Sequence, residues 1–212
     1  MASAGDDAVK KAAPGRIPTP PLPEGCIPLE HQVAGHIHGQ GKTKAGMLQF
    51  IDGSLLKPIQ APPRGRREHE FYCEVFHGDT DDPDLHILQR FLPRFLGTFT
   101  SPLHPDITYL KLEDITQRFN KPCILDVKMG KQVYEKGTPR DKVELARKKY
   151  PPLDRVGFQL LGMRIYHSSI DEYVFYDKTY GRSLDEDQVI EGLARYLNSD
   201  EELRTDVIPA FI

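Results

Sequence analysis

An aspartate and a lysine stand two positions apart in the short apolar segment PCILDVKMG. Such a segment is typical of a β-strand, in which successive side chains point to opposite faces. Asp126 and Lys128 are therefore expected on one face, while Leu125, Val127 and Met129 point the other way into a core. Opposite charges on one strand face can form a simple surface ion pair, or they can be directed at a bound ligand. The segment by itself favours neither.

Two earlier charged residues indicate what that ligand could be. Lys57 lies in the second strand of a hairpin predicted by MLQFIDGSLLKPI, and Glu68 near the start of a helix predicted by RREHEFYCEVF. A strand lysine, a helix acid and then a polar-faced strand is the order around the nucleotide cleft of two-lobed kinases. No glycine-rich GxGxxG or Walker motif accompanies Lys57, however. A hairpin lysine is more often solvated, and Glu68 can equally be a favourable charge at a helix N-terminus.

The segment from Lys128 to Lys149 is basic, with eight basic residues against three acidic ones in a chain of net charge -3. A helix predicted for DKVELARKKY, with Thr138 as N-cap, would place Lys142 and Lys149 on one face. Several phosphates need several donors, so this segment favours a small polyanion, with a solvated helix face as the alternative. RNA is disfavoured because no aromatic residues alternate with the charges. The basic residues are Lys128, Lys131, Lys136, Arg140, Lys142, Arg147, Lys148 and Lys149.

The sequence argues against metal-centred and nucleophilic hydrolytic chemistry. Its histidines form no HExxH pattern, and His36 and His38, on one strand face, have no evident third ligand. A GxSxG motif is absent, and no cysteine stands in a marked basic setting.

Further elements must hold these residues in place. ITYLKL, GFQLLGMRIYH and DEYVFYDKTY are predicted strands. A capping box from Ser183 to Glu186 is expected to open a helix through Leu197, and another helix is expected in SDEELRTDVIPAFI, where the sequence ends. Residues 1–24 contain five prolines and few large apolar groups, which predicts a disordered tail.

The composition is that of a soluble globular protein in a reducing compartment. Hydrophobic residues make up 39% and charged residues 28% of the chain, and no apolar run approaches the length of a membrane span. The N-terminus lacks a secretory signal, and three scattered cysteines argue against a disulfide framework. We therefore expect a monomer with nuclear and cytoplasmic localisation. The small net charge gives no reason to expect nucleic acid as a partner.

PCILDVKMG matches the PxxxDxKxG signature of the inositol polyphosphate kinase family. HQVAGH, LLKPIQAPPRGRREHEFY, LKLEDIT, GFQLLGMRIYH and YGRSL resemble segments of that family in the same order, so the resemblance runs from about residue 25 to the end of the chain. CIPLEHQVAGH and the short link from the signature to the lysine-bearing helix most resemble the branch of the family with broad substrate use.

The resemblance implies an α+β, two-lobed kinase-like fold with antiparallel sheets. Residues 25–112 would form the N-terminal ATP-binding lobe, and residues 113–212 the hinge and an incomplete C-terminal lobe. The implied activity is phosphorylation of inositol trisphosphate and tetrakisphosphate, with ATP and Mg²⁺ as cofactors. Phosphoinositide lipid at a membrane surface is a further candidate substrate.

The resemblance also implies roles for single residues. Lys57 matches a contact to the ATP phosphates, Asp126 faces the nucleotide, and Lys128 supports the transferring phosphoryl group and touches the substrate. Lys178 stands where relatives carry a glutamine, in a substrate-binding position. The remaining implied contacts are the adenine-binding hinge residues Glu113, Asp114 and Ile115 and the inositol phosphate contacts Arg64, Lys142 and Lys149.

Two motifs of the family are not found in the sequence, one with a magnesium-binding aspartate and one with a substrate histidine; both would follow residue 212. The chain is therefore expected to hold no metal ligand of its own and to transfer phosphate poorly. Two alternatives stay open. One is a non-catalytic module that binds inositol phosphates or a protein partner. The other is a different branch of the family, inositol trisphosphate 3-kinase or inositol hexakisphosphate kinase.

Overall fold

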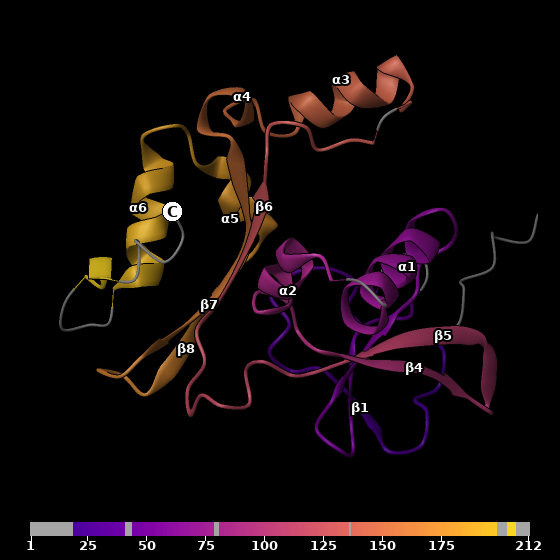
Figure 1. Cartoon of the computed structure of the whole chain (residues 1–212). Helices are drawn as coiled ribbons and strands as arrows, with labels where there is room; N and C mark the ends of the chain where they lie inside the picture. Colours follow the sequence, from indigo (N-terminus) through magenta and orange to yellow (C-terminus); the bar gives the residue numbers. More distant parts are fainter. Residues whose placement is uncertain (1–18, 41–43, 79–80, 136, 199–202, 207–212) are drawn as a thin grey trace, which may run out of the picture.

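Two antiparallel sheets organise the computed structural model, which describes residues 19–40, 44–78, 81–135, 137–198 and 203–206 (Figure 1). The five-stranded sheet has the order β1-β2-β3-β5-β4, and the three-stranded sheet has the order β6-β7-β8. Helices pack on both, so the fold is the α+β arrangement with antiparallel sheets that the sequence predicts. Within the described ranges, no helix is both long enough and apolar enough to cross a membrane.

The five-stranded sheet contains the predicted hairpin, since β2 pairs with β3 around the turn at Asp52 and Gly53. Gly53 has a φ of +86°, which residues with a side chain rarely adopt. The elements of this part are β1 (Cys26–Pro28), β2 (Leu48–Phe50), β3 (Leu55–Pro58), α1 (Arg64–His77), α2 (Pro83–Gln89), β4 (Phe95–Ser101) and β5 (His104–Leu112).

Strand alternation gives this sheet two apolar faces. Leu110 lies on the face that α1 covers and packs in one cluster with Tyr72 and Phe95. Its neighbour Tyr109 packs on the opposite face in a cluster with Leu56. Because Leu56 points to the Tyr109 side, the next residue on β3 is directed toward α1. That residue is Lys57, the lysine expected to bind phosphate.

The second sheet has its core between β7 and two following helices. Leu160, Met163 and Ile165 are buried there, and Leu125 and Val127 of the signature segment pack against them, as predicted. The elements are β6 (Ile124–Met129), α3 (Arg140–Lys148), α4 (Leu153–Val156), β7 (Phe158–His167), β8 (Glu172–Tyr176), α5 (Lys178–Ser183) and α6 (Gln188–Leu197).

Two local predictions around α3 and β6 are wrong. Met129 is exposed rather than in the core, because β6 ends at that residue. Thr138 does not cap α3: its hydroxyl donates to the carbonyl of Glu135, and Pro139 occupies the N-cap position without a side-chain hydrogen bond. The threonine therefore fixes the turn before the helix instead of the helix end.

The strand predicted for DEYVFYDKTY is correct only in its first part. Asp177 accepts hydrogen bonds from the backbone N–H groups of Thr179 and Tyr180, so it acts as the N-cap of α5. The cap diverts the chain from strand to helix, which places Lys178 in the first turn of α5.

The predicted capping box lies two residues later than expected. Ser183 donates instead to the carbonyl of Tyr180. Asp185 accepts from the N–H of Gln188, while the Gln188 side chain accepts from the N–H of Asp185, which is the reciprocal arrangement of a capping box. Glu186 takes no part in it, and α6 begins at Gln188.

Two expectations fall largely outside the described residues. The disordered tail is predicted over residues 1–24, of which the structure describes only 19–24. Most of the last predicted helix, residues 199–202 and 207–212, also lies outside the described ranges. Of that helix, the structure describes only residues 203–206, where Leu203 forms a bridge with Asn198.

The segment before β2 also reaches the second sheet. A Cβ on Gly162 of β7 would lie 2.2 Å from the carbonyl oxygen of Val33. Only glycine permits this approach, because any side chain would collide with the backbone of the other segment. The chain near Val33 therefore lies directly on β7 and joins the two sheets.

The hairpin turn predicts a measurable pH dependence. Asp52 accepts from Lys111 Nζ at 2.5 Å and from the Ser54 hydroxyl at 2.6 Å, which lowers the pKa of Asp52 to about 2. The folded-state pKa lies below the unfolded value, so the stabilisation is present above about pH 4 and is lost as the pH falls toward 2. Because the side chain is 47% exposed, solvent screens the pair, and we expect Asp52→Asn to cost less than about 1 kcal/mol at pH 7.

Urea midpoints of the wild type and Asp52→Asn, compared between pH 7 and pH 2.5, check this expectation. The difference between the two proteins should shrink as the pH falls. A difference that stays constant across this range would show that the Asp52 charge does not contribute.

Candidate functional site

Lys57 and Glu68 form an ion pair between the sheet and its helix. Lys57 lies on β3 on the side that α1 covers, and its Nζ donates to the Glu68 carboxylate on the second turn of α1. Both side chains stay partly exposed. The structure therefore brings together two residues that the sequence placed eleven positions apart, with the lysine held in place and still accessible.

Asp126 faces the same space from the second sheet. Burial raises the pKa of its carboxyl, and the positive charge of Lys57 acts in the opposite direction, so the two groups lie within electrostatic reach. Lys128 is exposed, and its Nζ donates to the Val133 carbonyl at 3.3 Å. Among the described residues no ion pair joins Asp126 to Lys128, so the surface-pair interpretation of this strand finds no support.

The segment between the sheets is held by a buried carboxylate. The side chain of Asp114 is 1% exposed, and its Oδ1 accepts from both the N–H and the hydroxyl of Thr116. Its Oδ2 lies 3.9 Å from His31 Nε2, and His31 also contacts the Thr116 hydroxyl. His31 belongs to the same segment as Val33, so the chain before β2 fixes both the hinge and β7.

The backbone of the hinge presents polar groups to a ligand. Within the described chain, the carbonyl of Glu113 and the N–H of Ile115 make no backbone hydrogen bond, while the N–H of Glu113 donates to the Arg94 carbonyl. A free acceptor and a free donor two residues apart can pair with the edge of a planar heterocycle. In the hinge, the Asp114 side chain is thus held by hydrogen bonds, while two neighbouring backbone groups have no backbone partner.

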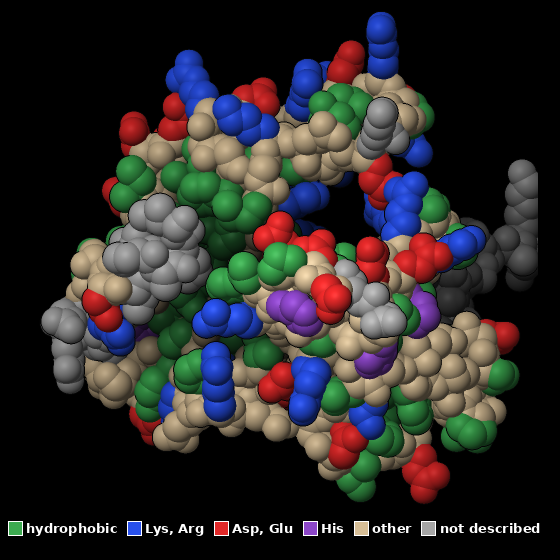
Figure 2. All heavy atoms as spheres, in the orientation of Figure 1, with side chains coloured by type: hydrophobic (Ala, Val, Ile, Leu, Met, Phe, Trp, Pro, Cys, Tyr) green, Lys and Arg blue, Asp and Glu red, His purple; other side chains and the backbone are tan. Residues whose placement is uncertain are grey.

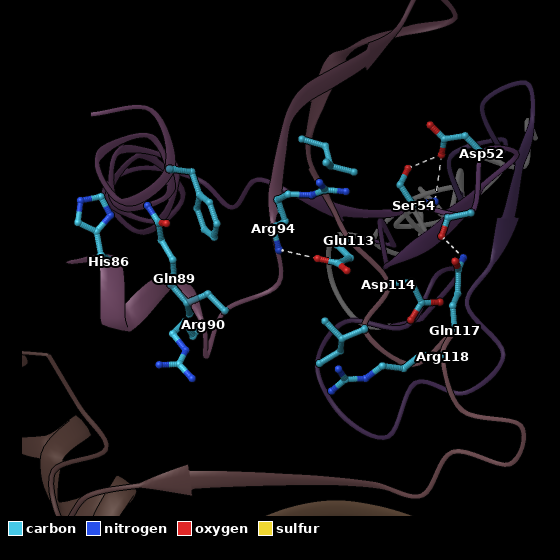
Figure 3. Close-up of a pocket in the computed structure, with 15 residues that line it drawn as sticks. Asp52, Ser54, His86, Gln89, Arg90, Arg94, Glu113, Asp114, Gln117 and Arg118 are labelled. Carbon is cyan, nitrogen blue, oxygen red and sulfur yellow. Dashed lines mark hydrogen bonds between the residues drawn. The ribbon is translucent and has the colours of Figure 1, made fainter. Parts of the chain in front are cut away.

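A pocket of about 890 Å³ lies beside the hinge (Figure 3). It opens between α2 on one side and the β2–β3 turn on the other, and Lys57, Glu68, Asp126 and Lys128 do not line it. The pocket and the lysine–aspartate cluster therefore have no lining residue in common, and the hinge residues Glu113, Asp114 and Ile115 line the pocket. The charged and amide side chains that line the pocket include Arg90, Arg94, Glu113, Asp114, Gln117 and Arg118.

The predicted inositol phosphate contacts come from three elements. Arg64 is the first residue of α1, Lys142 lies exposed on α3, and Lys149 follows the end of α3. Figure 2 shows an opening between the part of the molecule that carries α3 and the part that carries α1, with acidic and basic side chains meeting at one side. Lys178 is exposed on α5, which packs on β7 and β8. Among the described residues, no hydrogen bond or ion pair joins Lys178 to Arg64, Lys142 or Lys149. Lys136 lies outside the described residues.

The sequence reasoning missed the contact of Glu135 with the arginines of α1. Glu135 contacts Arg64, its Oε1 lying 2.5 Å from the arginine Nε, and its Oε2 lies 3.5 Å from an amino nitrogen of Arg67. A pair separated by 71 positions leaves no periodic signal in the sequence. The role of His31 was missed for the same reason, although HQVAGH was already singled out.

Side chains that could bind a metal ion do not cluster among the described residues. Within the ranges that the structure describes, no three His, Cys, Asp or Glu side chains come together as a metal site. Glu68 is already paired with Lys57, and Asp126 is a second carboxylate within electrostatic reach of that lysine. A single carboxylate can hold Mg²⁺ only together with other ligands such as phosphate oxygens.

Comparisons with known proteins agree on one family. The family model "Inositol polyphosphate kinase" matches residues 109–212. The inositol polyphosphate multikinase of Mus musculus is 45% identical over 195 residues, which cover 92% of this chain and 49% of the mouse protein. Inositol polyphosphate multikinase alpha of Arabidopsis thaliana is 31% identical over 81% of this chain and 59% of its own length. The chain thus spans about half the length of the curated relatives it matches most strongly.

A solved structure is similar as well. The inositol phosphate multikinase Ipk2 of S. cerevisiae, in complex with ADP and Mn²⁺, superimposes with a TM-score of 0.51 at 27% identity. The similarity covers 68% of this chain and 57% of the yeast chain.

Proposed function

We propose that this chain, which belongs to the inositol polyphosphate kinase family, carries the nucleotide-binding and inositol phosphate-binding surfaces of an ATP-dependent kinase. The observation that carries the proposal is that Lys57, paired with Glu68 on one sheet, lies within electrostatic reach of the half-buried Asp126 on the other sheet. A lysine held by a helix carboxylate is suited to bind phosphate oxygens, and an aspartate facing it is suited to contact the nucleotide.

The hinge supports nucleotide binding. The free Glu113 carbonyl and the free Ile115 N–H offer the acceptor and donor that the adenine edge requires. Asp114 would act indirectly, because its side chain is buried and holds the turn through Thr116. We therefore assign the adenine contacts to the backbone and the turn geometry to Asp114.

The acceptor is proposed to be an inositol polyphosphate, either inositol trisphosphate or inositol tetrakisphosphate. Arg64 on α1, Lys142 on α3 and Lys149 at the end of α3 supply cationic donors, and Lys128 on β6 supplies a further one. Several cationic donors on separate elements suit a small ring that carries several phosphates. Phosphoinositide lipid shares this chemistry and is the further candidate. Nuclear and cytoplasmic localisation is part of the same proposal, and imaging of a tagged chain tests it.

A divalent cation would neutralise charge on the transferring phosphoryl group when bound. Asp126 would supply one of its ligands, and the nucleotide phosphates would supply others. The described residues do not form a complete metal site, so the alternative of a chain that binds inositol phosphates without transferring phosphate remains the competing hypothesis.

Transfer of labelled γ-phosphate from Mg-ATP to inositol trisphosphate tests the proposal, with the mouse relative assayed alongside. Product formation by this chain supports the kinase. Inositol trisphosphate binding without product, beside an active mouse enzyme, would favour the binding module. The absence of both nucleotide and inositol phosphate binding would contradict both.

The lysine–carboxylate pair gives a separate prediction for nucleotide binding. Lys57→Ala should weaken ATP affinity at least about tenfold, because a charge-assisted phosphate contact is lost and Glu68 is left without its partner. Lys111→Ala is the matched control: Lys111 lies on β5 of the same sheet, but its Nζ is bonded to Asp52 instead. Calorimetric titration with ATP measures both, and equal affinities of the two variants would contradict the role of Lys57.

A further inference from the structure

Glu135 makes a contact that the proposed function does not use. Its carboxylate lies between two arginines of α1, with Oε1 2.5 Å from Arg64 Nε and Oε2 3.5 Å from an amino nitrogen of Arg67. Glu135 belongs to the link between β6 and α3, whereas both arginines belong to the helix on the other sheet. The carboxylate therefore bridges the β6–α3 link of the second sheet and α1 of the first sheet.

Two features of α1, its uncapped N-terminus and its two arginines, favour an anion at this position. α1 has 14 residues, no side-chain hydrogen bond at its N-cap and no acidic residue in its first turn. The N-terminus of such a helix carries partial positive charge and free N–H groups, so it favours an anion. The two arginines add to that preference, because their guanidinium N–H groups donate to carboxylate or phosphate oxygens in the same geometry.

The carboxylate consequently resembles a substrate phosphate in charge and in contacts. Arg64 is a residue to which the proposed function assigns an inositol phosphate contact. While Glu135 is bound to Arg64, that arginine is not available to a phosphate. A phosphate group that approaches Arg64 and Arg67 must displace the carboxylate or accept a nearby like charge.

We propose that Glu135 is an internal competitor that occupies the arginine site of α1 until an inositol phosphate replaces it. This inference rests on the proposed function, because it requires Arg64 to bind substrate. Glu135 then sets the affinity of the arginine site for an inositol phosphate. Its negative charge disfavours most strongly the ligands that carry many phosphates. The ion pairs are substantially exposed, at 68% for Arg64 and 41% for Glu135, so solvent screening keeps the effect moderate.

The test measures binding of inositol trisphosphate and inositol hexakisphosphate to the whole 212-residue chain by calorimetry. Glu135→Gln should bind inositol trisphosphate about three- to tenfold more tightly, which is the range expected when two exposed ion pairs no longer compete. The gain should be larger for inositol hexakisphosphate. Glu144→Gln is the matched control, because it removes the same charge from the same basic segment and Glu144 makes no ion pair among the described residues.

A double-mutant cycle separates this inference from the proposed function. Arg64→Ala should weaken inositol trisphosphate binding, and adding Glu135→Gln to it should give a much smaller gain than in the wild type. ATP affinity should not change in Glu135→Gln, because the Lys57 site is not altered.

Each result decides something. If Arg64→Ala weakens binding but Glu135→Gln gains no more than Glu144→Gln, the competitor is disproved and the proposed substrate site stands. If Arg64→Ala leaves affinity unchanged, or the wild type binds no inositol phosphate, the substrate assignment fails and the inference fails with it. Weaker binding by Glu135→Gln would show that Glu135 supports the site instead of competing for it.

Discussion

Replacing Asp126 by asparagine should reduce phosphate transfer at least about a hundredfold while leaving the folded protein as stable as before or slightly more stable. In the proposed function Asp126 faces the nucleotide near Lys57, and the substitution removes its charge from that reacting centre, where such contacts have their largest effect. Asparagine keeps the size of the side chain, so no cavity is created.

The stability part of this expectation follows from the direction of the pKa shift. Burial raises the pKa of Asp126 above its unfolded value, so the folded state favours the protonated form. The contribution of this group is therefore most favourable below its unfolded pKa and declines as the pH rises through the folded pKa. At pH 7 the buried charge is unfavourable, and a neutral amide relieves it.

Labelled phosphate transfer and thermal unfolding at pH 7 measure the two effects. The substitution should be made in this chain, with the mouse relative assayed alongside as a positive control for transfer. Asp106→Asn, at an exposed position on β5, is the control. Normal transfer would remove Asp126 from the site, and a melting temperature lowered by several degrees would make its role structural.

Replacing Leu110 by alanine should lower the free energy of unfolding by about 2–5 kcal/mol. Leu110 is 0% exposed and packs with Tyr72 and Phe95 between β5 and α1. The loss is a large part of the roughly 5–15 kcal/mol that holds a domain of this size folded. Because α1 carries Glu68 and Arg64, weaker packing of α1 on the sheet should also weaken ATP binding at urea concentrations near the unfolding midpoint.

Urea unfolding followed by circular dichroism measures this change. Ile51→Ala is the matched control, since Ile51 is 82% exposed and its loss should change stability by no more than about 0.5 kcal/mol. A similar effect of both substitutions would mean that the cluster under α1 does not form the core of this half.

Periodicity and turn chemistry were sufficient for most elements. The hairpin at Asp52–Gly53, the helix that carries Glu68, and the strand that carries Asp126 and Lys128 are all present where the sequence predicts them. These features depend on residues close together in the chain, so a local pattern contains them. The family was recognised for the same reason, because PCILDVKMG is a contiguous signature.

Element ends were predicted less well, because several polar side chains compete for the same backbone groups. Thr138 and Ser183 both looked like caps, yet each donates to a carbonyl of the preceding turn. Asp177 and Asp185 hold the helix starts instead. Carboxylates accept two hydrogen bonds at once, which a single hydroxyl does less readily, and only the folded backbone decides which side chain is in reach.

The sequence by itself indicated the family and the identity of the charged residues, because these depend on patterns within one segment, and the α+β class followed from the family resemblance. The tertiary structure decided which of them meet. Lys57 and Asp126 come within electrostatic reach from two different sheets, which the chain around His31 and Val33 helps to join. Glu135 reaches the start of α1 across 71 positions for the same reason: contacts between distant segments are fixed by packing, which no local period records.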